Sequence, residues 1–267
     1  MQKIRLFAVL IAVFYSAQTT AQQPEKKTYL QLLQDVFQTE LVYPQEKNEF
    51  QFTVFPAYYQ HSGYEQIQLP FLAEYGINNR WQLEIEWNTF QYRKIHPGSS
   101  VSGTGDLEIG TKYSFMNIGN SDFHAAGGFE VGIPLGNEDK ELGEGLWEYE
   151  PYLLLAVDFP KLHNAQLFGQ AGISFVQQRE TEEPEGNELN LGGGFFIPFK
   201  PVIFSSELTW YHSKEANQLF YTPGAVWTMN NGWETGLAFP LGLNRQTLNF
   251  GIMAMITFEF NIEGDND

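Results

Sequence analysis

The sequence contains no cysteine among its 267 residues and few basic side chains. The absence of cysteine excludes disulfides, thiolate metal sites, a cysteine nucleophile and a lipid attached through sulfur. Fifteen lysines and arginines stand against 32 aspartates and glutamates, so no basic patch is available to bind nucleic-acid phosphates. The mean hydropathy is −0.29 and only one long apolar run occurs, which excludes a helical membrane protein. Aromatic residues make up 16% of the chain, too many for a disordered protein.

The single long apolar run lies near the N-terminus and predicts an export signal. Lys3 and Arg5 precede an apolar stretch over Leu6–Tyr15, and small and polar residues follow it. We expect cleavage after Ala21, so that residues 1–21 form a signal peptide. A membrane anchor is the alternative, but about ten apolar residues are only half of a spanning helix. The mature protein is therefore expected to be exported.

From Glu49 onward the side chains alternate in character with a period of two, which is typical of strands with two different faces. The clearest segment is Arg80–Trp87, where tryptophan, leucine and isoleucine share one face and glutamine and glutamate share the other. About twelve such segments can be counted. They begin near Glu49, Gln66, Arg80, Thr104, Phe123, Trp147, Ala165, Asn187, Val202, Asn217, Trp233 and Thr247.

The connectors between these segments predict how the strands are joined. Short turns at one rim and longer loops at the other are typical of outer-membrane barrels in Gram-negative bacteria. We predict an all-β fold, a transmembrane antiparallel up-and-down β-barrel of about twelve strands over residues 49–260. The short turns are expected at 76–79, 160–164, 200–201 and 230–232, and the longer loops at Phe90–Gly103, 134–146 and 177–186.

Aromatic residues on the apolar face concentrate near the ends of the predicted strands. Amphipathic rings favour the interface between lipid and water, so a transmembrane barrel should carry two aromatic girdles. A soluble two-sheet sandwich also alternates, but it would bury its aromatic residues in the middle of its strands. The expected periplasmic girdle comprises Phe50, Tyr75, Trp81, Tyr113, Phe115, Phe123, Phe159, Trp227, Trp233 and Phe260, and the outer girdle comprises Tyr58, Trp87, Trp147, Phe175, Trp210 and Tyr221.

Residues 22–48 form a separate N-terminal periplasmic segment between the signal and the barrel. Leucine and phenylalanine side chains at helical spacing predict a short amphipathic helix over Thr28–Leu41. This segment is expected either to plug the barrel from inside or to remain a periplasmic tail or an extension of the first strand. The acidic tail, residues 261–267, is expected to be a disordered end.

The parity that points apolar side chains toward lipid points acidic side chains into the barrel. Such an excess of carboxylates cannot all be buried, charged and dry, because each unpaired buried charge costs several kcal/mol. We therefore expect a water-containing lumen that admits cations or neutral polar solutes and repels anions. The alternative is a closed barrel whose acids bond to glutamine, tyrosine and serine neighbours. The predicted lumen-lining residues are Glu84, Glu86, Asp106, Glu108, Lys112, Glu130, Glu148, Glu150, Glu207 and Glu234.

One of the predicted strands carries a family motif. The run Gly-Thr-Gly-Asp-Leu-Glu-Ile-Gly-Thr-Lys-Tyr-Ser-Phe over residues 103–115 resembles the G-x-G-D-x-x-L-G-x-K-Y-x-F stretch of the outer-membrane family named after the meta-pathway of phenol degradation, with Ile109 in place of leucine. The run Val42–Lys47 is also similar to members of that family. The resemblance implies a β-barrel transporter without catalytic or cofactor residues. It does not imply phenol as the substrate, and an acidic lumen favours uncharged aromatic or cationic solutes over carboxylates.

Outer-membrane barrels can also be hydrolases that use serine–histidine pairs. His61 and His212 are each followed by serine, but adjacent residues on a strand point to opposite faces and cannot form a dyad. His124 is expected in the lumen and His163 in a periplasmic turn. We therefore predict that the protein is not an enzyme, with an outer-membrane hydrolase as the alternative function.

The remaining motifs point to no cofactor or metal. The acidic loops 137–141 and 180–183 lack the spacing and the glycine of a Ca²⁺-binding loop. The run Gly192–Gly194 is expected to relieve crowding or to permit strand curvature. A non-transporting surface barrel is a further alternative, although its outer loops are short for that role. The expected partners are outer-membrane lipid and lipopolysaccharide, the barrel-assembly machinery through the C-terminal strand ending at Phe260, and a small solute.

Overall fold

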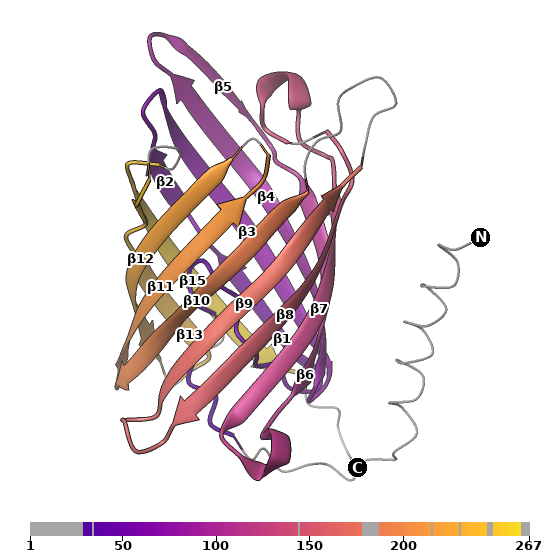
Figure 1. Ribbon diagram of the computed structural model, residues 1–267, viewed down its shortest axis with the longest axis vertical. Helices are drawn as coiled ribbons and strands as arrows, with labels where there is room; N and C mark the ends of the chain where they lie inside the picture. The colour runs from indigo at the N-terminus through magenta and orange to yellow at the C-terminus, as the bar shows by residue number, and fades with distance from the viewer. Residues whose placement is uncertain are drawn as a thin grey trace, which may run out of the picture. The chain divides into compact units, whose positions relative to one another are not determined.

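The computed structural model describes most of the chain after residue 28 (Figure 1). The predicted signal peptide, the acidic loop 180–183 and residues 263–267 lie outside the described residues. From Gln31 onward the chain forms one compact unit. No helix in the described part of the chain is long and apolar enough to cross a bilayer. The described residues are 29–33, 35–143, 145–177, 187–214, 216–229, 231–244 and 248–262.

The unit is an antiparallel β-barrel whose sheet closes on itself. The first strand pairs with the last and with the third, so that Phe50 lies opposite Phe260 on one side and Tyr75 on the other. The strands are β1 (Glu49–Val54), β2 (Ala57–Gln60), β3 (Tyr64–Asn78), β4 (Trp81–Ile95), β5 (Ser99–Gly103), β6 (Leu107–Phe115), β7 (Phe123–Ile133), β8 (Glu148–Phe159), β9 (Ala165–Val176), β10 (Glu188–Phe199), β11 (Val202–His212), β12 (Asn217–Thr228), β13 (Trp233–Ala238), β14 (Leu241–Gly242) and β15 (Phe250–Asn261).

In the described residues the chain runs from one end of the barrel to the other twelve times, and we call each run a pass. Fifteen strands result because three of the passes are each divided into two strands. Pro56 separates β1 from β2 and Pro240 separates β13 from β14, since proline has no N–H to donate to the ladder. β5 and β6 together form the third interrupted pass. The prediction of about twelve strands is confirmed, and Phe123, Ala165 and Val202 begin strands as expected.

The two ends of the barrel carry different connections. At one end the turns are short, as at 79–80, 160–164 and 200–201, and the connection from β6 to β7 holds the 3₁₀-helix η1 (Ile118–Asn120). At the other end, the long connection from β7 to β8 holds the 3₁₀-helix η2 (Glu138–Lys140). This asymmetry agrees with the predicted arrangement of short turns and longer loops.

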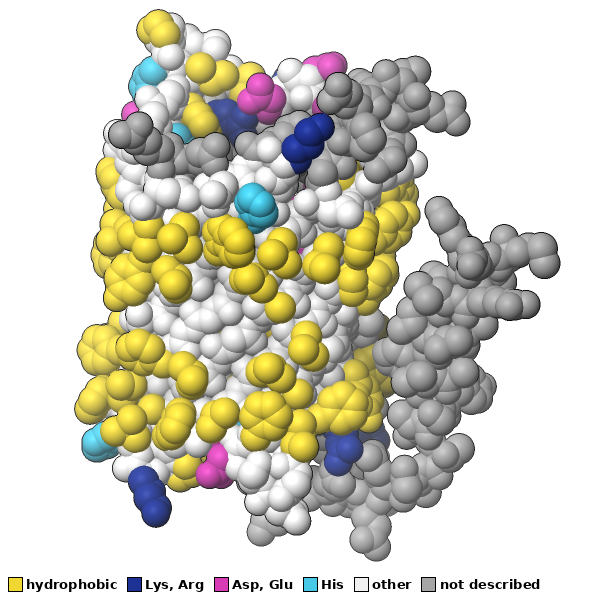
Figure 2. All heavy atoms as spheres, viewed as in Figure 1, with side chains coloured by type: hydrophobic (Ala, Val, Ile, Leu, Met, Phe, Trp, Pro, Cys, Tyr) yellow, Lys and Arg dark blue, Asp and Glu magenta, His cyan; other side chains and the backbone are white. Residues whose placement is uncertain are grey.

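Alternation along each strand sorts side chains between the outside and the inside of the barrel. On β4, Gln82 and Glu84 are buried, whereas Leu83 and Ile85 are 44% and 46% exposed. Figure 2 shows hydrophobic side chains gathered in two bands on the visible wall, with charged side chains near the two ends. A wall that is apolar outside and polar inside is suited to hydrocarbon surroundings.

Aromatic side chains cluster where the periplasmic girdle is predicted. The ring of Phe50 lies 4.5 Å from that of Tyr75 and 5.7 Å from that of Phe260, measured between centroids. Trp233 packs against Phe258 at 4.8 Å. These residues come from the ends of β1, β3, β13 and β15 that meet at the short-turn end.

The predicted loop over Phe90–Gly103 is wrong. β4 continues to Ile95 and pairs with β5 in an extended hairpin whose tip is formed by residues 96–98. Opposite the stretch between Gln68 and Pro70 of β3, β4 carries one additional residue. This bulge reverses the alternation of the residues that follow it, so the period of two is interrupted in the sequence although the strand continues.

The predicted helix over Thr28–Leu41 is also wrong, because its described residues form no helix. We call the described residues of 31–47 the plug. They run inside the barrel, where Figure 1 shows the indigo chain that precedes β1, and Leu33, Val36 and Leu41 are 1–3% exposed. Side chains of the barrel wall bind the plug's N–H and C=O groups, which replaces the hydrogen bonds that a helix would supply.

Candidate functional site

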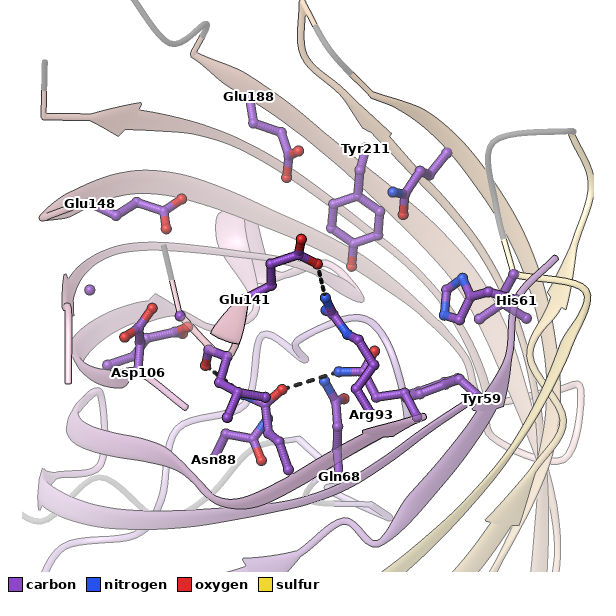
Figure 3. Close-up of a pocket in the computed structure, with 18 of the residues that line it drawn as sticks. Tyr59, His61, Gln68, Asn88, Arg93, Asp106, Glu141, Glu148, Glu188 and Tyr211 are labelled. Carbon is purple, nitrogen blue, oxygen red and sulfur yellow. Dashed lines mark hydrogen bonds and ion pairs between the residues drawn. The ribbon is translucent and has the colours of Figure 1, made fainter. Parts of the chain in front are cut away.

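A cavity of about 730 Å³ lies inside the barrel toward the end with the longer loops (Figure 3). The connection 134–147 folds inward and contributes Leu142, which is 2% exposed, to the lining. A second cavity of about 370 Å³ is lined in part by Asp35–Glu40 of the plug. Glu86 and Glu108 line both cavities, so the two spaces adjoin.

Glutamates form two rows across β4, β6, β7 and β8 on the inner face of the barrel. Glu86 of β4 lies directly opposite Glu108 of β6. Glu130 of β7 lies directly opposite Glu150 of β8 in the second row. Like charges at opposed positions of a sheet are destabilising. Their repetition across neighbouring strands therefore does not serve the stability of the barrel.

Glycines give the glutamates room to converge. Gly110 lies between Glu84 and Glu130 in one row, and an added Cβ there would be 2.7 Å and 2.9 Å from their Cγ atoms. Gly132 occupies the corresponding position beside Glu148, where an added Cβ would be 3.0 Å from its Cβ. Alternating glutamate and glycine thus concentrates carboxylates on one side of the lumen.

Neutral donors bind two of these carboxylates. Glu84 accepts hydrogen bonds from Gln82 Nε2 at 3.0 Å and from the Tyr152 hydroxyl at 3.1 Å. Glu150 accepts one from the Ser174 hydroxyl at 2.6 Å. The glutamine, tyrosine and serine partners are those expected for a filled barrel, yet they occur beside two cavities.

Lys112 is the cation of the inner acidic cluster and is 3% exposed. Its Nζ lies 2.6 Å from Glu40 Oε1 and donates to the carbonyl oxygen of Leu41 at 2.8 Å. Carboxylate oxygens of Glu40, Glu84 and Glu130 lie within 4.8 Å of one another. One ammonium group therefore joins the plug to an acidic wall.

Arg93 is a second cation in the lining and was missed by the sequence reasoning. Its Nη1 lies 2.5 Å from Glu141 Oε2, and the two side chains are 17% and 76% exposed (Figure 3). Gln91 Nε2 donates to the Leu142 carbonyl at 3.0 Å, which also holds the inward-folded connection. Arg93 lies beyond the β4 bulge, where the reversed alternation brings it to the cavity.

Three other predicted lumen-lining residues, Asp106, Glu207 and Glu234, lie in different parts of the barrel. Asp106 lines the larger cavity and accepts a hydrogen bond from the N–H of Gly136 at 2.7 Å. Glu207 is 1% exposed and contacts the plug. Glu234 lies on β13 opposite Thr257 and lines neither cavity.

Uncharged residues form much of the larger cavity and were not predicted. Tyr59, Tyr211, Gln68 and Asn88 line it together with His61 (Figure 3). The prediction of lumen-lining residues was based on charged side chains, so it did not include them. The inward parity of Gln66 and Gln68 on β3 was the available signal.

Side chains of the wall bind the backbone of the plug at several positions. The Glu207 carboxylate accepts the N–H groups of Phe37 at 3.0 Å and of Gln38 at 2.8 Å. The Ser114 hydroxyl donates to the Val42 carbonyl at 2.7 Å. Two further backbone N–H groups donate to wall amides, Glu40 to Gln170 at 3.0 Å and Gln45 to Gln82 at 3.0 Å.

Missing side chains on the wall make space for the plug. An added Cβ on Gly224 or Gly236 would lie 2.5 Å or 2.7 Å from the ring of Phe37. An added Cβ on Gly192 would lie 3.1 Å from the hydroxyl oxygen of Thr39. At Gly192, the predicted relief of crowding thus serves the plug.

The histidines form no serine–histidine pair among the hydrogen bonds of the described residues. His61 and His212 stack on neighbouring tyrosine and tryptophan rings, with centroids 4.0 Å and 5.3 Å apart. His124 is fully buried, its Nε2 lies 2.9 Å from Asp158, and its Nδ1 accepts the N–H of Asn117 at 3.0 Å. Both ring nitrogens of His124 are therefore engaged in structural contacts.

Neither a family model nor a curated protein matches the sequence, so the resemblance to the phenol-degradation family stays a prediction. Solved structures do match. An outer-membrane channel from Pseudomonas putida F1 has a TM-score of 0.64 at 11% identity, over 82% of this chain and 98% of that chain. The NanC porin has a TM-score of 0.55 at 11% identity, over 79% and 100%. The β domain of the Bordetella autotransporter BrkA has a TM-score of 0.53 at 13% identity, over 80% and 100%. The fold is that of outer-membrane β-barrels.

These identities establish the fold and no more. A channel, a porin and an autotransporter domain share it, so the same barrel serves different functions. The function has to be argued from the cavity and the plug.

Proposed function

We propose that the protein is an outer-membrane channel for small solutes, which passes cations and uncharged polar or aromatic molecules and excludes anions. The observation that carries this proposal is the two rows of glutamates on the inner face, with Glu86 opposite Glu108 and Glu130 opposite Glu150. Glu86 and Glu108 line both cavities and Glu130 lines the smaller one. Rings and rows of carboxylates in a pore attract cations and repel anions.

The positive groups offset this acidity only in part. Lys112 contacts Glu40, and Arg93 contacts Glu141, so each cation already has an acidic partner. Carboxylates remain in excess around both cavities. An entering anion would therefore meet net repulsion, whereas a cation would not.

The neutral lining supports passage of uncharged molecules. Tyr59 and Tyr211 offer aromatic and hydroxyl surfaces, and Gln68 and Asn88 offer both donors and acceptors. Such groups can replace part of the hydration of a polar solute and can contact an aromatic ring. We place the short turns in the periplasm and the longer loops outside, so that solutes enter the larger cavity first.

Liposome permeation and single-channel recordings with purified full-length protein test this proposal. We expect cationic and neutral solutes to enter faster than anionic solutes of similar size. The double variant Glu86→Gln with Glu108→Gln should lower the cation-to-anion permeability ratio, and Asp122→Asn in the exposed β6–β7 connection should leave it unchanged. No permeation above empty liposomes would refute the channel, and a preference for anions would refute the proposed selectivity.

A further inference from the structure

The plug lies in the path of a solute that enters from the larger cavity. Residues Asp35–Glu40 line the adjoining smaller cavity. Farther toward the short-turn end, Leu41, Val42 and Tyr43 are 0–2% exposed. Tyr43 is fixed there, because its hydroxyl donates to Asp158 at 3.1 Å. The plug therefore occupies the lumen between the larger cavity and the short-turn end.

The barrel does not need the plug to complete its sheet. β1 pairs with β15 on one side and with β3 on the other, so every pass has two neighbours in the described barrel. No described plug residue belongs to a strand. Departure of the plug would therefore break side-chain contacts and leave the backbone ladder intact.

One set of contacts that hold the plug comes from β11, β12 and β13. Glu207 of β11 binds two consecutive backbone N–H groups, those of Phe37 and Gln38. The ring of Phe37 fills the space left by Gly224 of β12 and Gly236 of β13. A carboxylate and an apolar ring pocket thus act together on one turn of the plug.

We call the Glu207 carboxylate and the pocket that holds the Phe37 ring the latch. The barrel wall around the latch contains polar groups that would gain hydrogen bonds from water. The hydroxyl oxygens of Ser205, Thr209 and Thr222 are buried and have no hydrogen-bond partner within the described residues. Ser205 and Thr209 flank Glu207 on β11, and Thr222 lies opposite Glu207 on β12. Water that entered a vacated lumen would bind these hydroxyls and the freed carboxylate.

We infer that the plug is a gate. In the closed state the latch, formed by Glu207 and the pocket of the Phe37 ring, holds the plug in the position seen in the structure, its seat. The plug leaves this position to open the lumen. This inference rests on the proposed channel function. The apolar side chains buried in the plug make the closed form the resting state. The polar side chains that now bind its backbone then line an open, hydrated passage.

A disulfide staple tests the gate directly, because the chain has no cysteine of its own. The Oγ1 and Cγ2 atoms of Thr39 lie 3.1 Å and 3.4 Å from the position of a Cβ on Gly192. The β-carbons of Thr39→Cys and Gly192→Cys therefore fall within the roughly 3.5–4.5 Å that a disulfide requires. Oxidation should fix the plug in its seat.

We expect the oxidised double variant to conduct poorly and reduction with dithiothreitol to raise its conductance roughly tenfold or more. Each single cysteine variant should not respond to the reductant. Equal conductance of the oxidised and reduced forms, with the disulfide verified by mass, would overturn the gate and leave the channel standing. No conductance in any form, with heat-modifiable gel mobility showing a folded barrel, would overturn the channel proposal and the gate with it.

A second variant approaches the gate from the opposite direction. Gly236→Ala places a methyl group 2.7 Å from the Phe37 ring and should displace the plug and raise channel opening. Adding Phe37→Leu should remove the response to Gly236→Ala. Gly127→Ala is the matched control, because its added Cβ comes no closer than 3.8 Å to another residue. Unchanged opening in folded Gly236→Ala would contradict the latch.

Discussion

Glu86 of β4 and Glu108 of β6 lie directly opposite each other in an antiparallel pair, and both line the two cavities of the lumen. Two carboxylates at opposed positions repel each other, so this pairing destabilises the sheet that carries it. A pairing that harms stability and faces a cavity is best explained by the solute that the cavity receives.

Replacing one member of this pair should therefore stabilise the barrel while it impairs selectivity. We expect Glu108→Gln to raise the free energy of unfolding by about 0.2–1 kcal/mol through relief of repulsion. Urea titration of the barrel in detergent micelles measures that change, with Asp122→Asn as a neutral control. A lower unfolding midpoint for Glu108→Gln would show that Glu108 makes a stabilising contact, contrary to this argument.

Arg93 should matter for charge selectivity more than for stability. Its partner Glu141 is 76% exposed, and ion pairs of this kind contribute about 0.2–1 kcal/mol. Arg93→Gln should thus change the unfolding midpoint little, but it removes a positive charge from the cavity and should increase the cation-to-anion permeability ratio. Reversal potentials in a salt gradient measure this ratio. A shift toward anions would contradict the assignment of Arg93 to the conducting cavity.

The strands could be predicted because each of their faces meets a different environment. Arg80–Trp87 alternates perfectly, and the structure exposes Leu83 and buries Glu84 as that pattern requires. The prediction failed beyond the bulge in β4, where one additional residue exchanges the two faces. Arg93 lies beyond the bulge, so it was not predicted to line the lumen. Periodicity identifies a strand only while its register with the neighbouring strand is regular.

The plug was harder to predict because its partners are remote in the sequence. Leu33, Phe37 and Leu41 have helical spacing, yet they are buried around an irregular backbone. The groups that decide this conformation are side chains such as Glu207 and Lys112, which compete for the backbone N–H and C=O groups. No local sequence pattern indicates this competition, so the conformation of the plug could not be predicted from the sequence.

Lys112 should be the most sensitive charged position in the lumen. Lys112→Met leaves Glu40, Glu84 and Glu130 close together without their ammonium partner. Breaking a buried pair in this way typically costs about 3–5 kcal/mol. The temperature at which the folded band converts on gels should fall, and Lys161→Met in an exposed turn should leave it unchanged.

The same cluster provides an internal check on that prediction. Adding Glu40→Gln to Lys112→Met removes one of the uncompensated charges and should recover part of the lost stability. If the two substitutions instead add independently, Lys112 and Glu40 are not coupled and the ion pair does not hold the plug.

The plug also contains an acid, Asp35, whose protonation depends on whether the plug is inside the barrel. Burial raises the pKa of the Asp35 carboxyl to about 6, while the Lys112 ammonium opposes the shift and Glu40 adds to it. Gln51 of β1 donates to this carboxyl at 2.6 Å, and Glu74 of β3 and Glu86 of β4 are further acidic groups that interact with it. At a pH between the raised pKa of Asp35 and the lower pKa of a solvated aspartate, the seated plug therefore retains a proton that the released plug has lost.

Plug release should consequently become easier as the pH rises. A solvated aspartate titrates near a pKa of about 3.9, so below this value both forms are protonated and the stabilisation of the seated plug is complete. Between that value and about 6 the released form loses its proton first, and the stabilisation is lost as the pH passes the pKa of the seated form. Channel opening should increase over this interval and then level off, as single-channel recordings from pH 4 to 8 would measure. Asp35→Asn should remove this component of the pH response, because the amide does not titrate, whereas an identical response in wild type and variant would exclude Asp35 as its source.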